Sequence, residues 1–347
     1  MSNLSIVITT RNRHEILQEC LNAILDSKRA DLIQDIIVVD DGSVDDTTEY
    51  LNQLKGDSRI ITVIRNDIAR GPAAARNQGI KEAKSEYTLI MGDDVILFPE
   101  TIEVFHKHIE QHGSENASML GNIIPHPEGI SAFEYWSSNG GSQFAHYRIT
   151  EEERFDAGDE YFYTSNIVTP TRMLRDNPFD ESFYYPRYED RELGYRLKKK
   201  YGHVIHYLED ARSYHKHKVV FKNWLLSFEH FTSAALHFSS LYPEDSELKV
   251  KMGIERALKT CRFRYSALSN AVHILNDHHR NYFDSSDRFE LSWIRDVTGG
   301  SFRLLQEFYR LSFYRRHLNE SQMIDPESGM AASEAMDSIL DKLGDDV

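Results

Sequence analysis

The stretch "LSIVITTRNRHEILQECLNAILDS", residues 4–27, joins an apolar, β-branched run to an amphipathic segment through a short polar turn. The run over residues 4–10 predicts a buried strand, and the apolar residues after it recur at helical spacing. Three further strand-like segments, "DIIVV", "RIITVIRN" and "YTLIM", each precede a helix-like segment before residue 113. This alternation predicts an α/β fold, with an open parallel sheet that carries helices on its faces.

Polar clusters follow three of these strands: "TTRNR" (9–13), "DDGS" (40–43) and "GDD" (92–94). In open α/β sheets, ligands bind beyond the carboxyl ends of the strands. Asp93 and Asp94 come directly after an apolar strand, where an ionised carboxylate needs a cation or hydrogen-bond donors. We therefore expect a positively charged partner or ligand beside these two aspartates.

Composition excludes several classes of protein. The net charge of −15 argues against general nucleic-acid binding, which requires a basic face. The two cysteines, Cys20 and Cys261, support neither a disulfide framework nor a cysteine-based zinc site. The sequence has no apolar run of membrane-spanning length and no leader pattern, so we expect a folded, cytoplasmic protein.

Six motifs occur together in this chain. They are "IVITTRNR", "VVDDGSVDDT", "GPAAARNQG", "LIMGDDV", "FDESFYYPRYEDRELGYRL" and "YHKH". In this order and spacing they resemble the inverting family 2 glycosyltransferases of the GT-A fold, over about residues 3–217. The resemblance implies a metal-dependent enzyme that moves a sugar from a nucleotide-sugar donor to a hydroxyl group.

The resemblance also implies a metal site. Asp94 matches the last acid of the family's Asp-x-Asp motif, while Gly92 stands at the first position of that motif, so Asp94 is preferred over Asp93 as the ligand. A downstream histidine completes the metal shell in the family, and His215 or His217 would do so here. The expected ion is Mn²⁺ or Mg²⁺, which neutralises a diphosphate.

A second set of residues matches the donor-binding positions of the family. Asp41 corresponds to the acid that accepts a hydrogen bond from the base ring, which favours UDP, with dTDP next. Arg76 would reach the ribose or the phosphates, with Arg13 a weaker candidate for the same role. The full set of expected nucleotide-sugar contacts is Thr9, Thr10, Arg11, Asp40, Asp41, Arg76 and Asp93.

The catalytic base is expected at the start of a helix. Inversion in one displacement requires a base on the face opposite the leaving diphosphate. In the resemblance this base is Asp190, which Glu189 precedes. The helix dipole favours negative charge at this end, so we expect Asp190 to be ionised near neutral pH.

Structural explanations compete with each of these assignments. Asp93 and Asp94 could cap a turn, and "DDGS" is also a good helix N-cap. "EDRELGYRLKKK" has the pattern of an exposed helix, with acids early and lysines late. Tyr135 and Trp136 would stack on an acceptor sugar or, more simply, pack in a core.

The resemblance and the change in composition together predict the domains. We expect a catalytic domain over 1–218, with a nucleotide-binding half (1–112) and an acceptor-side half (113–218). A helical domain over 219–323 and an acidic, flexible tail over 324–347 would follow it. The tail has seven acids and one lysine, a composition typical of disorder.

Partners and rival functions complete the interpretation. Lys249, Lys251, Arg256, Lys259, Arg262 and Arg264 give the helical region a basic face. That face would be solvated, contact the inner face of a membrane that carries lipid-linked acceptors, or join subunits of a homo-oligomer.

The expected function is synthesis of surface polysaccharide or glycoconjugate. The alternatives are a catalytically silent GT-A-like scaffold and a sugar nucleotidyltransferase, although the glycine-rich loop of the latter is missing.

Overall fold

The computed structural model describes residues 3–57, 60–127, 132–138, 144, 146–216, 219–255, 263–278, 288–317, 323–325 and 330–344. The chain forms two compact units. The first unit comprises Met1–His126 and Phe144–His217, and the second comprises Pro127–Gln143 and Lys218–Val347.

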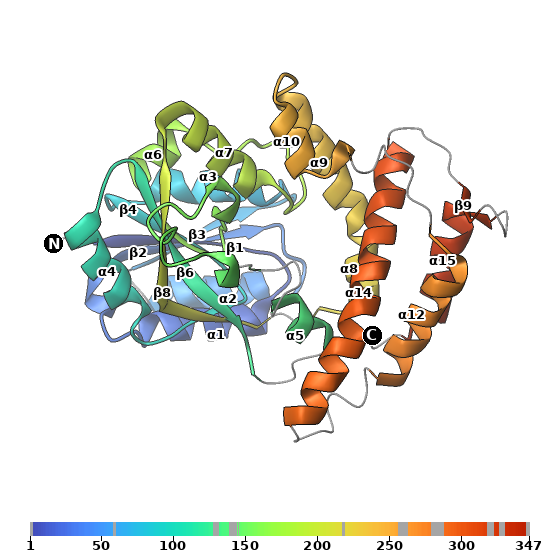
Figure 1. Ribbon diagram of the computed structural model, residues 1–347. Helices are drawn as coiled ribbons and strands as arrows, with labels where there is room; N and C mark the ends of the chain where they lie inside the picture. The colour runs from blue at the N-terminus through green and yellow to red at the C-terminus, as the bar shows by residue number, and fades with distance from the viewer. Residues whose placement is uncertain are drawn as a thin grey trace. The chain divides into compact units, whose positions relative to one another are not determined.

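The first unit is built on an eight-stranded sheet, in the order β3-β2-β1-β4-β7-β6-β8-β5 (Figure 1). The strands are β1 (Leu4–Thr10), β2 (Ile33–Asp41), β3 (Ile61–Asn66), β4 (Tyr87–Gly92), β5 (Val95–Leu97), β6 (Ala117–Pro125), β7 (Asn166–Pro170) and β8 (Val204–His215). The strands β1 to β4 pair in parallel, as the alternation predicts. Beyond these four strands the sheet is mixed, because β7 runs antiparallel to β4 and β6, and β5 runs antiparallel to β8.

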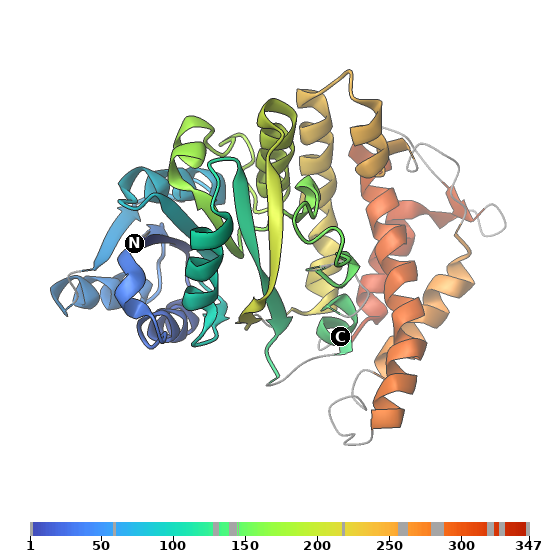
Figure 2. The ribbon, with the colours of Figure 1, turned by 60° about the vertical axis from the view of Figure 1, so that its left-hand side comes forward.

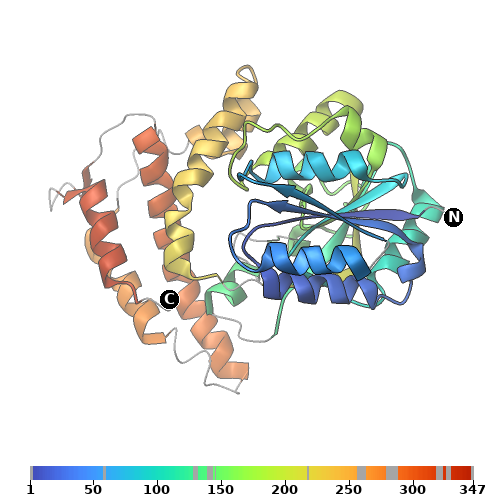
Figure 3. The same cartoon turned by 180° about the vertical axis from the view of Figure 1, so that it is seen from behind.

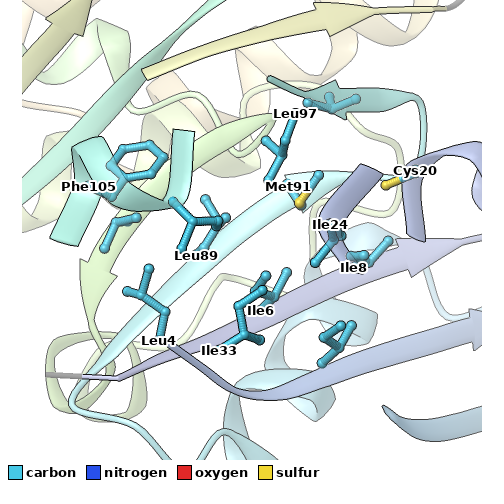
Figure 4. Close-up of a cluster of buried hydrophobic side chains, with 14 of the residues drawn as sticks. Leu4, Ile6, Ile8, Cys20, Ile24, Ile33, Leu89, Met91, Leu97 and Phe105 are labelled. Carbon is cyan, nitrogen blue, oxygen red and sulfur yellow. The ribbon is translucent and has the colours of Figure 1, made fainter. Parts of the chain in front are cut away.

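Helices cover both faces of the parallel part. The helices α1 (His14–Leu25) and α2 (Thr47–Asp57) lie on one face, and α3 (Pro72–Glu82) lies on the other (Figure 3). Alternate residues of a strand point to opposite faces, so β1 contributes to both cores. Ile6 and Ile8 pack on the side of α1, whereas Val7 packs on the side of α3. Figure 4 shows the first of these cores.

The remaining elements of the first unit position the later motifs. The helices are α4 (Thr101–His112), α6 (Thr171–Asp176) and α7 (Glu189–Tyr201), with 3-10 turns at Ala30–Leu32, His146–Arg148 and Asp159–Tyr161. The long strand β8 lies beside β6 (Figure 2) and reaches His215, so the "YHKH" motif begins at a strand end. This places the motif at the sheet rather than in a loop.

The second unit is mostly helical, as the sequence predicts. Its helices are α5 (Ala132–Ser138), α8 (Phe221–Leu226), α9 (Phe228–Leu241), α10 (Ser246–Lys251), α12 (Tyr265–His278), α14 (Arg288–His317) and α15 (Ala332–Lys342). A two-stranded sheet joins β9 (Met323–Asp325) and β10 (Met330–Ala331). Within the described ranges, none of these helices combines the length and the apolar character needed to cross a bilayer.

Residues 127–143 group with the second unit, although the sequence predicts that they belong to the first domain. Their helix, α5, contributes Phe133 and Trp136 to an aromatic core. The ring centroids of Phe133 and Phe221 are 4.9 Å apart, and those of Trp136 and Phe302 are 5.3 Å apart. Trp136 is therefore a core residue, while the side chain of Tyr135 lies outside the described part.

The prediction of a flexible tail over 324–347 is wrong for the segment that forms α15. Ala335 and Ile339 lie one turn apart on this helix and are buried, and Leu343 follows them into the same core. The prediction of disorder follows from the many acids of this segment. In the structure acids such as Asp337 are exposed, while the apolar residues lie together on one face of the helix.

The basic face of the second unit is only partly described. Arg256, Lys259 and Arg262 lie outside the described residues. The Lys249 ammonium donates to the carbonyl of Pro243 at 2.7 Å, and Lys251 lies 3.6 Å from Glu247. Membrane contact and assembly into oligomers therefore stay predictions.

Candidate active site

The ends of β1 and β4 bring a cation to the two aspartates that follow β4. The Arg13 guanidinium donates through one nitrogen to Asp93 Oδ1 at 3.0 Å and to Asp94 Oδ2 at 2.5 Å. The Thr10 hydroxyl donates to the other oxygen of Asp93 at 2.7 Å. Burial raises the pKa of Asp93 to about 6, and the neighbouring Asp94 adds to this effect, while Arg13 opposes it. The expected positive partner is thus present within the chain itself.

Strand pairing brings His215 to Asp94. Val95 lies opposite His215 where β5 pairs with β8, and the backbone N–H of Lys216 donates to the carbonyl of Asp94 at 2.8 Å. His215 Nε2 lies 3.7 Å from Asp94 Oδ2. The structure therefore brings together these two predicted metal ligands. His217, the other predicted histidine, lies outside the described residues.

The separation of Asp94 and His215 fits a shared metal ion. Two donor atoms that each lie about 2.1 Å from one ion are at most about 4.2 Å apart, and 3.7 Å is within this limit. In the described part of the chain, no group of three or more His, Cys, Asp or Glu side chains is arranged to hold a metal. Asp94 and His215 would hold such an ion, and the substrate diphosphate or water would complete its shell.

The two aspartates of "DDGS" have different surroundings. Asp40 accepts from Ser43 N through one oxygen and from Thr48 and Arg65 through the other, both at 2.7 Å. Asp40 therefore shapes the turn between β2 and α2. Three of the roughly four acceptor positions of this carboxylate are used, so a contact of Asp40 with a nucleotide stays a prediction.

Asp41 fastens the loop before α3. One of its oxygens accepts from Asn66 Nδ2 at 2.8 Å and from Arg70 N at 2.9 Å, and the other accepts from Gly71 N at 2.8 Å. A carboxylate has about four acceptor positions, so one remains for a base N–H. Gly71 has a φ of +89°, and a Cβ there would meet the carbonyl of Tyr184 at 2.5 Å. Asp41 thus holds this loop against the segment that leads to α7.

The predicted nucleoside contacts at the end of β1 differ in their surroundings. Thr10 is buried and its hydroxyl is used by Asp93, so it supports the acidic pair rather than facing a nucleoside. Thr9, opposite Gly92 in the pairing of β1 with β4, is partly buried, and Arg11 is exposed. Thr9 and Arg11 stay predictions as nucleoside contacts.

Arg76 contacts a different partner from the one predicted. Its guanidinium donates to Glu189 Oε1 at 2.6 Å and lies over the Phe179 ring, with its central carbon 5.6 Å from the ring centroid. It therefore reaches the start of α7, where Glu189 is buried, and its contact with a ribose or phosphate stays a prediction. No local sequence pattern indicates this pairing, since 113 residues separate the two side chains.

Asp190 lies in the first turn of α7, after Tyr188, whose φ of +66° is in the left-handed region. The backbone N–H of Arg191 donates to Asp190 Oδ1 at 2.7 Å. Burial raises the pKa of Asp190 to about 7, and Glu189 raises it further, against the effect of Arg76. Burial thus opposes the helix dipole that is expected to keep Asp190 ionised, and the ionisation of Asp190 near neutral pH stays a prediction. A pKa near 7 suits a general base.

Comparison with known proteins identifies the family of this chain. Residues 5–183 match the model of the family described as Glycosyl transferase family 2. GlyG, a glycosyltransferase of Streptococcus pneumoniae, is 26% identical over 197 residues, which cover 56% of this chain and 64% of the relative. A GalNAc(5)-diNAcBac-PP-undecaprenol β-1,3-glucosyltransferase of Campylobacter jejuni is 26% identical over 207 residues, with 59% and 63% covered. The chain thus spans just under two thirds of the length of these curated relatives.

The fold comparison extends over more of the chain. The mannosyltransferase PcManGT from Pyrobaculum calidifontis superposes with a TM-score of 0.56 at 13% identity, covering 89% of this chain and 87% of that one. This likeness confirms the predicted GT-A fold. Since the family match covers slightly more than half of the 347 residues, the chain belongs to glycosyl transferase family 2.

Proposed function

We propose that this protein is a metal-dependent, inverting glycosyltransferase that uses a UDP-sugar, or a dTDP-sugar, as its donor. The observation that carries the proposal is the meeting of Asp94 and His215 at the end of β4, 3.7 Å apart and beside Arg13. The membership of the family supports the class of reaction. The structure of PcManGT, described as a complex with GDP-Man and Mn²⁺, supports the use of a metal.

The residues of the chain divide the reaction between them. Asp94 and His215 would hold Mn²⁺ or Mg²⁺, which supplies positive charge to the leaving diphosphate. Asp190 would take the proton of the acceptor hydroxyl. The hydroxyl oxygen then bonds to the anomeric carbon as the bond between this carbon and the diphosphate oxygen breaks. Asp41 would accept a hydrogen bond from the base ring at its remaining acceptor position.

The acceptor is proposed to be a glycan or a lipid-linked saccharide of surface polysaccharide or glycoconjugate synthesis. The name of the Campylobacter jejuni relative describes an undecaprenol-linked acceptor, which supports this class. We assign donor binding to residues 1–112 and acceptor binding to the later part of the first unit. The second unit would contribute to acceptor binding, membrane contact or subunit assembly.

A thermal-shift screen with UDP, dTDP, GDP and their sugars, each with and without Mn²⁺, tests the donor and the metal together. We expect the largest rise in Tm with UDP or a UDP-sugar and Mn²⁺, because a ligand that binds only the folded state stabilises it. At one hundred times the Kd this amounts to about 2.7 kcal/mol. A larger shift with GDP than with UDP or dTDP would overturn the proposed nucleotide. Equal shifts with and without Mn²⁺ would overturn the proposed dependence on a metal.

Slow hydrolysis of the preferred UDP-sugar separates an enzyme from a silent scaffold. We expect release of UDP that depends on Mn²⁺, since water can replace the acceptor. A scaffold would bind the donor and release nothing. A sugar nucleotidyltransferase would instead form a nucleotide sugar from a nucleoside triphosphate and a sugar phosphate.

The pH profile of transfer tests the environment of Asp190. Because the base must be deprotonated, kcat/KM is expected to rise with pH through an apparent pKa of about 7. Glu189 raises this pKa, so Glu189→Gln should move the rise to lower pH. Glu181→Gln, at an exposed acid of the same unit, should leave the profile in place. An unmoved profile in Glu189→Gln would show that another group limits the rate.

A further inference from the structure

Arg13 is a cation in direct contact with a proposed metal ligand, and the reaction as described so far gives it no part. Its nitrogen Nη1 donates to Asp93 Oδ1 at 3.0 Å and to Asp94 Oδ2 at 2.5 Å. The second of these oxygens is the one that lies 3.7 Å from His215 Nε2. Arg13 and a metal ion held by Asp94 and His215 would therefore share one carboxylate oxygen.

The two cations would lie close together at this oxygen. An ion about 2.1 Å from Asp94 Oδ2 would be at most about 4.6 Å from the guanidinium nitrogen in its observed position. The side chain of Asp94 is only 13% exposed, so water screens the repulsion between the two cations incompletely. Binding of a dication by Asp94 is therefore expected to drive the Arg13 guanidinium away from this carboxylate.

The backbone of Arg13 is held in place, so this movement would involve its side chain alone. The backbone N–H of Arg13 donates to the Thr47 hydroxyl at 3.1 Å. The side chain is 34% exposed, so part of it already faces solvent. Asp93 does not depend on Arg13 alone, because the Thr10 hydroxyl donates to its other oxygen at 2.7 Å. The guanidinium can thus leave Asp94 while the surrounding backbone stays as it is.

The position of Arg13 in the sheet places it between the two ends of the proposed donor site. Arg13 follows β1, and β1 lies between β2 and β4 in the sheet. The connection that carries Arg13 is bonded to the turn after β2, because Asn12 N donates to the Ser43 hydroxyl at 2.9 Å. A nucleotide with its base at Asp41, after β2, and its diphosphate at Asp94, after β4, would therefore cross the end of β1 beside Arg13.

We propose that Arg13 is an exchangeable cation of the donor site, which the metal ion displaces from Asp94 and which the donor diphosphate then binds. The inference rests on the proposed function and adds a residue to its donor site. The planar guanidinium presents a fork of donors that matches phosphate oxygens. A metal ion that binds alone breaks the contact of Arg13 with Asp94, whereas a metal ion that binds with a diphosphate gives Arg13 another anion. Mn²⁺ and UDP therefore strengthen each other's binding.

Calorimetry of UDP and electron paramagnetic resonance of free Mn²⁺ measure this exchange. In the parent protein we expect the Kd of Mn²⁺ to be at least about tenfold lower with saturating UDP than without nucleotide. Arg13→Gln removes the competing charge, so Mn²⁺ alone should bind this variant at least about tenfold more tightly than the parent protein. UDP in saturating Mn²⁺ should bind the variant about tenfold more weakly, because the contact with the phosphate is lost.

Two further variants control for the charge and for its position. Arg29→Gln removes the same charge from an arginine of the same unit that pairs with Asp31 at 2.9 Å and is 36% exposed, so it should change neither affinity. Arg13→Lys keeps a positive charge beside the two aspartates, so its affinity for Mn²⁺ alone should stay close to that of the parent protein.

Nuclear magnetic resonance of the arginine side chains follows Arg13 in the parent protein, so it does not depend on the folding of Arg13→Gln. With selectively ¹⁵N-labelled arginine, the Nε–H signal that is missing in Arg13→Lys belongs to Arg13. We expect this signal to shift when Mg²⁺, a diamagnetic ion, is added with UDP, because the guanidinium exchanges a carboxylate for a phosphate.

The outcomes separate this inference from the proposed function. Binding of Mn²⁺ alone that is no tighter in Arg13→Gln than in the parent protein would overturn the exchange, and so would an Arg13 signal that Mg²⁺ and UDP leave in place. Hydrolysis of the donor with Mn²⁺ in the parent protein reports the proposed function separately. A parent protein that hydrolyses the donor while either of these results is found would retain the proposed function without the exchange.

Discussion

Asp190→Asn is expected to abolish sugar transfer and to leave the affinity for UDP unchanged. Asparagine has nearly the same shape and keeps an oxygen for the Arg191 N–H, but it cannot take the proton of the acceptor. General-base catalysis contributes about 10²- to 10⁴-fold, so kcat should fall by at least that factor. Single-turnover transfer from a radiolabelled donor, together with calorimetry of UDP, measures both quantities.

The same substitution should not unfold the protein. Burial already disfavours the charge of Asp190, as the raised pKa shows, so a neutral side chain of equal size removes a cost. Asp180→Asn is the matched control, because Asp180 is in the same unit and its Oδ1 contact with Ser182 can be kept. Turnover close to that of the parent protein would remove Asp190 from the role of base.

Asp94→Ala is expected to remove the effect of Mn²⁺ on UDP binding. Loss of a residue that only supports a metal ligand commonly lowers affinity by 10- to 100-fold, so loss of the ligand itself should cost at least about 100-fold. Calorimetric titration of UDP with and without Mn²⁺ measures this directly. His215→Ala should act in the same direction, because His215 Nε2 lies 3.7 Å from the same carboxylate.

The fold of the Asp94→Ala variant should persist, because Arg13 keeps its contact with Asp93 at 3.0 Å. Asp210→Ala, at an exposed position on β8, controls for the loss of a carboxylate from the same unit. Binding of UDP that is independent of Mn²⁺ in the parent protein would contradict the metal site, whatever the variant does.

Local patterns were enough to predict much of the first unit. The period of the apolar residues defines β1 to β4 and their helices, because these elements follow one another along the chain. The antiparallel entry of β7 and the pairing of β5 with β8 depend on contacts between distant segments, which no local period records. The motifs identified the acids at the strand ends, but spacing alone does not reveal their partners.

Charged residues show this limit most clearly. The sequence predicts Arg13 only as a weaker candidate for a phosphate contact, and in the structure it bridges Asp93 and Asp94. The sequence predicts Arg76 at the donor and contains no sign of the pair that it forms with Glu189. The contacts of long charged side chains depend on which segments the tertiary structure brings within their reach, so local sequence patterns do not predict them. The helix α15 is a different case, because the spacing of its apolar residues already indicates an amphipathic helix. The many acids of this segment led instead to the prediction of disorder.

The ladder between β5 and β8 has a consequence for how the protein acquires its activity. Asp94 and His215 come from distant parts of the chain and meet where β5 pairs with β8. Bringing such distant segments together carries a loop-closure entropy that is repaid only once β8 has docked. An intermediate that contains β1 to β4 alone would have the acidic pair without its histidine. Tight manganese binding during refolding would then mark the moment at which the sheet is complete.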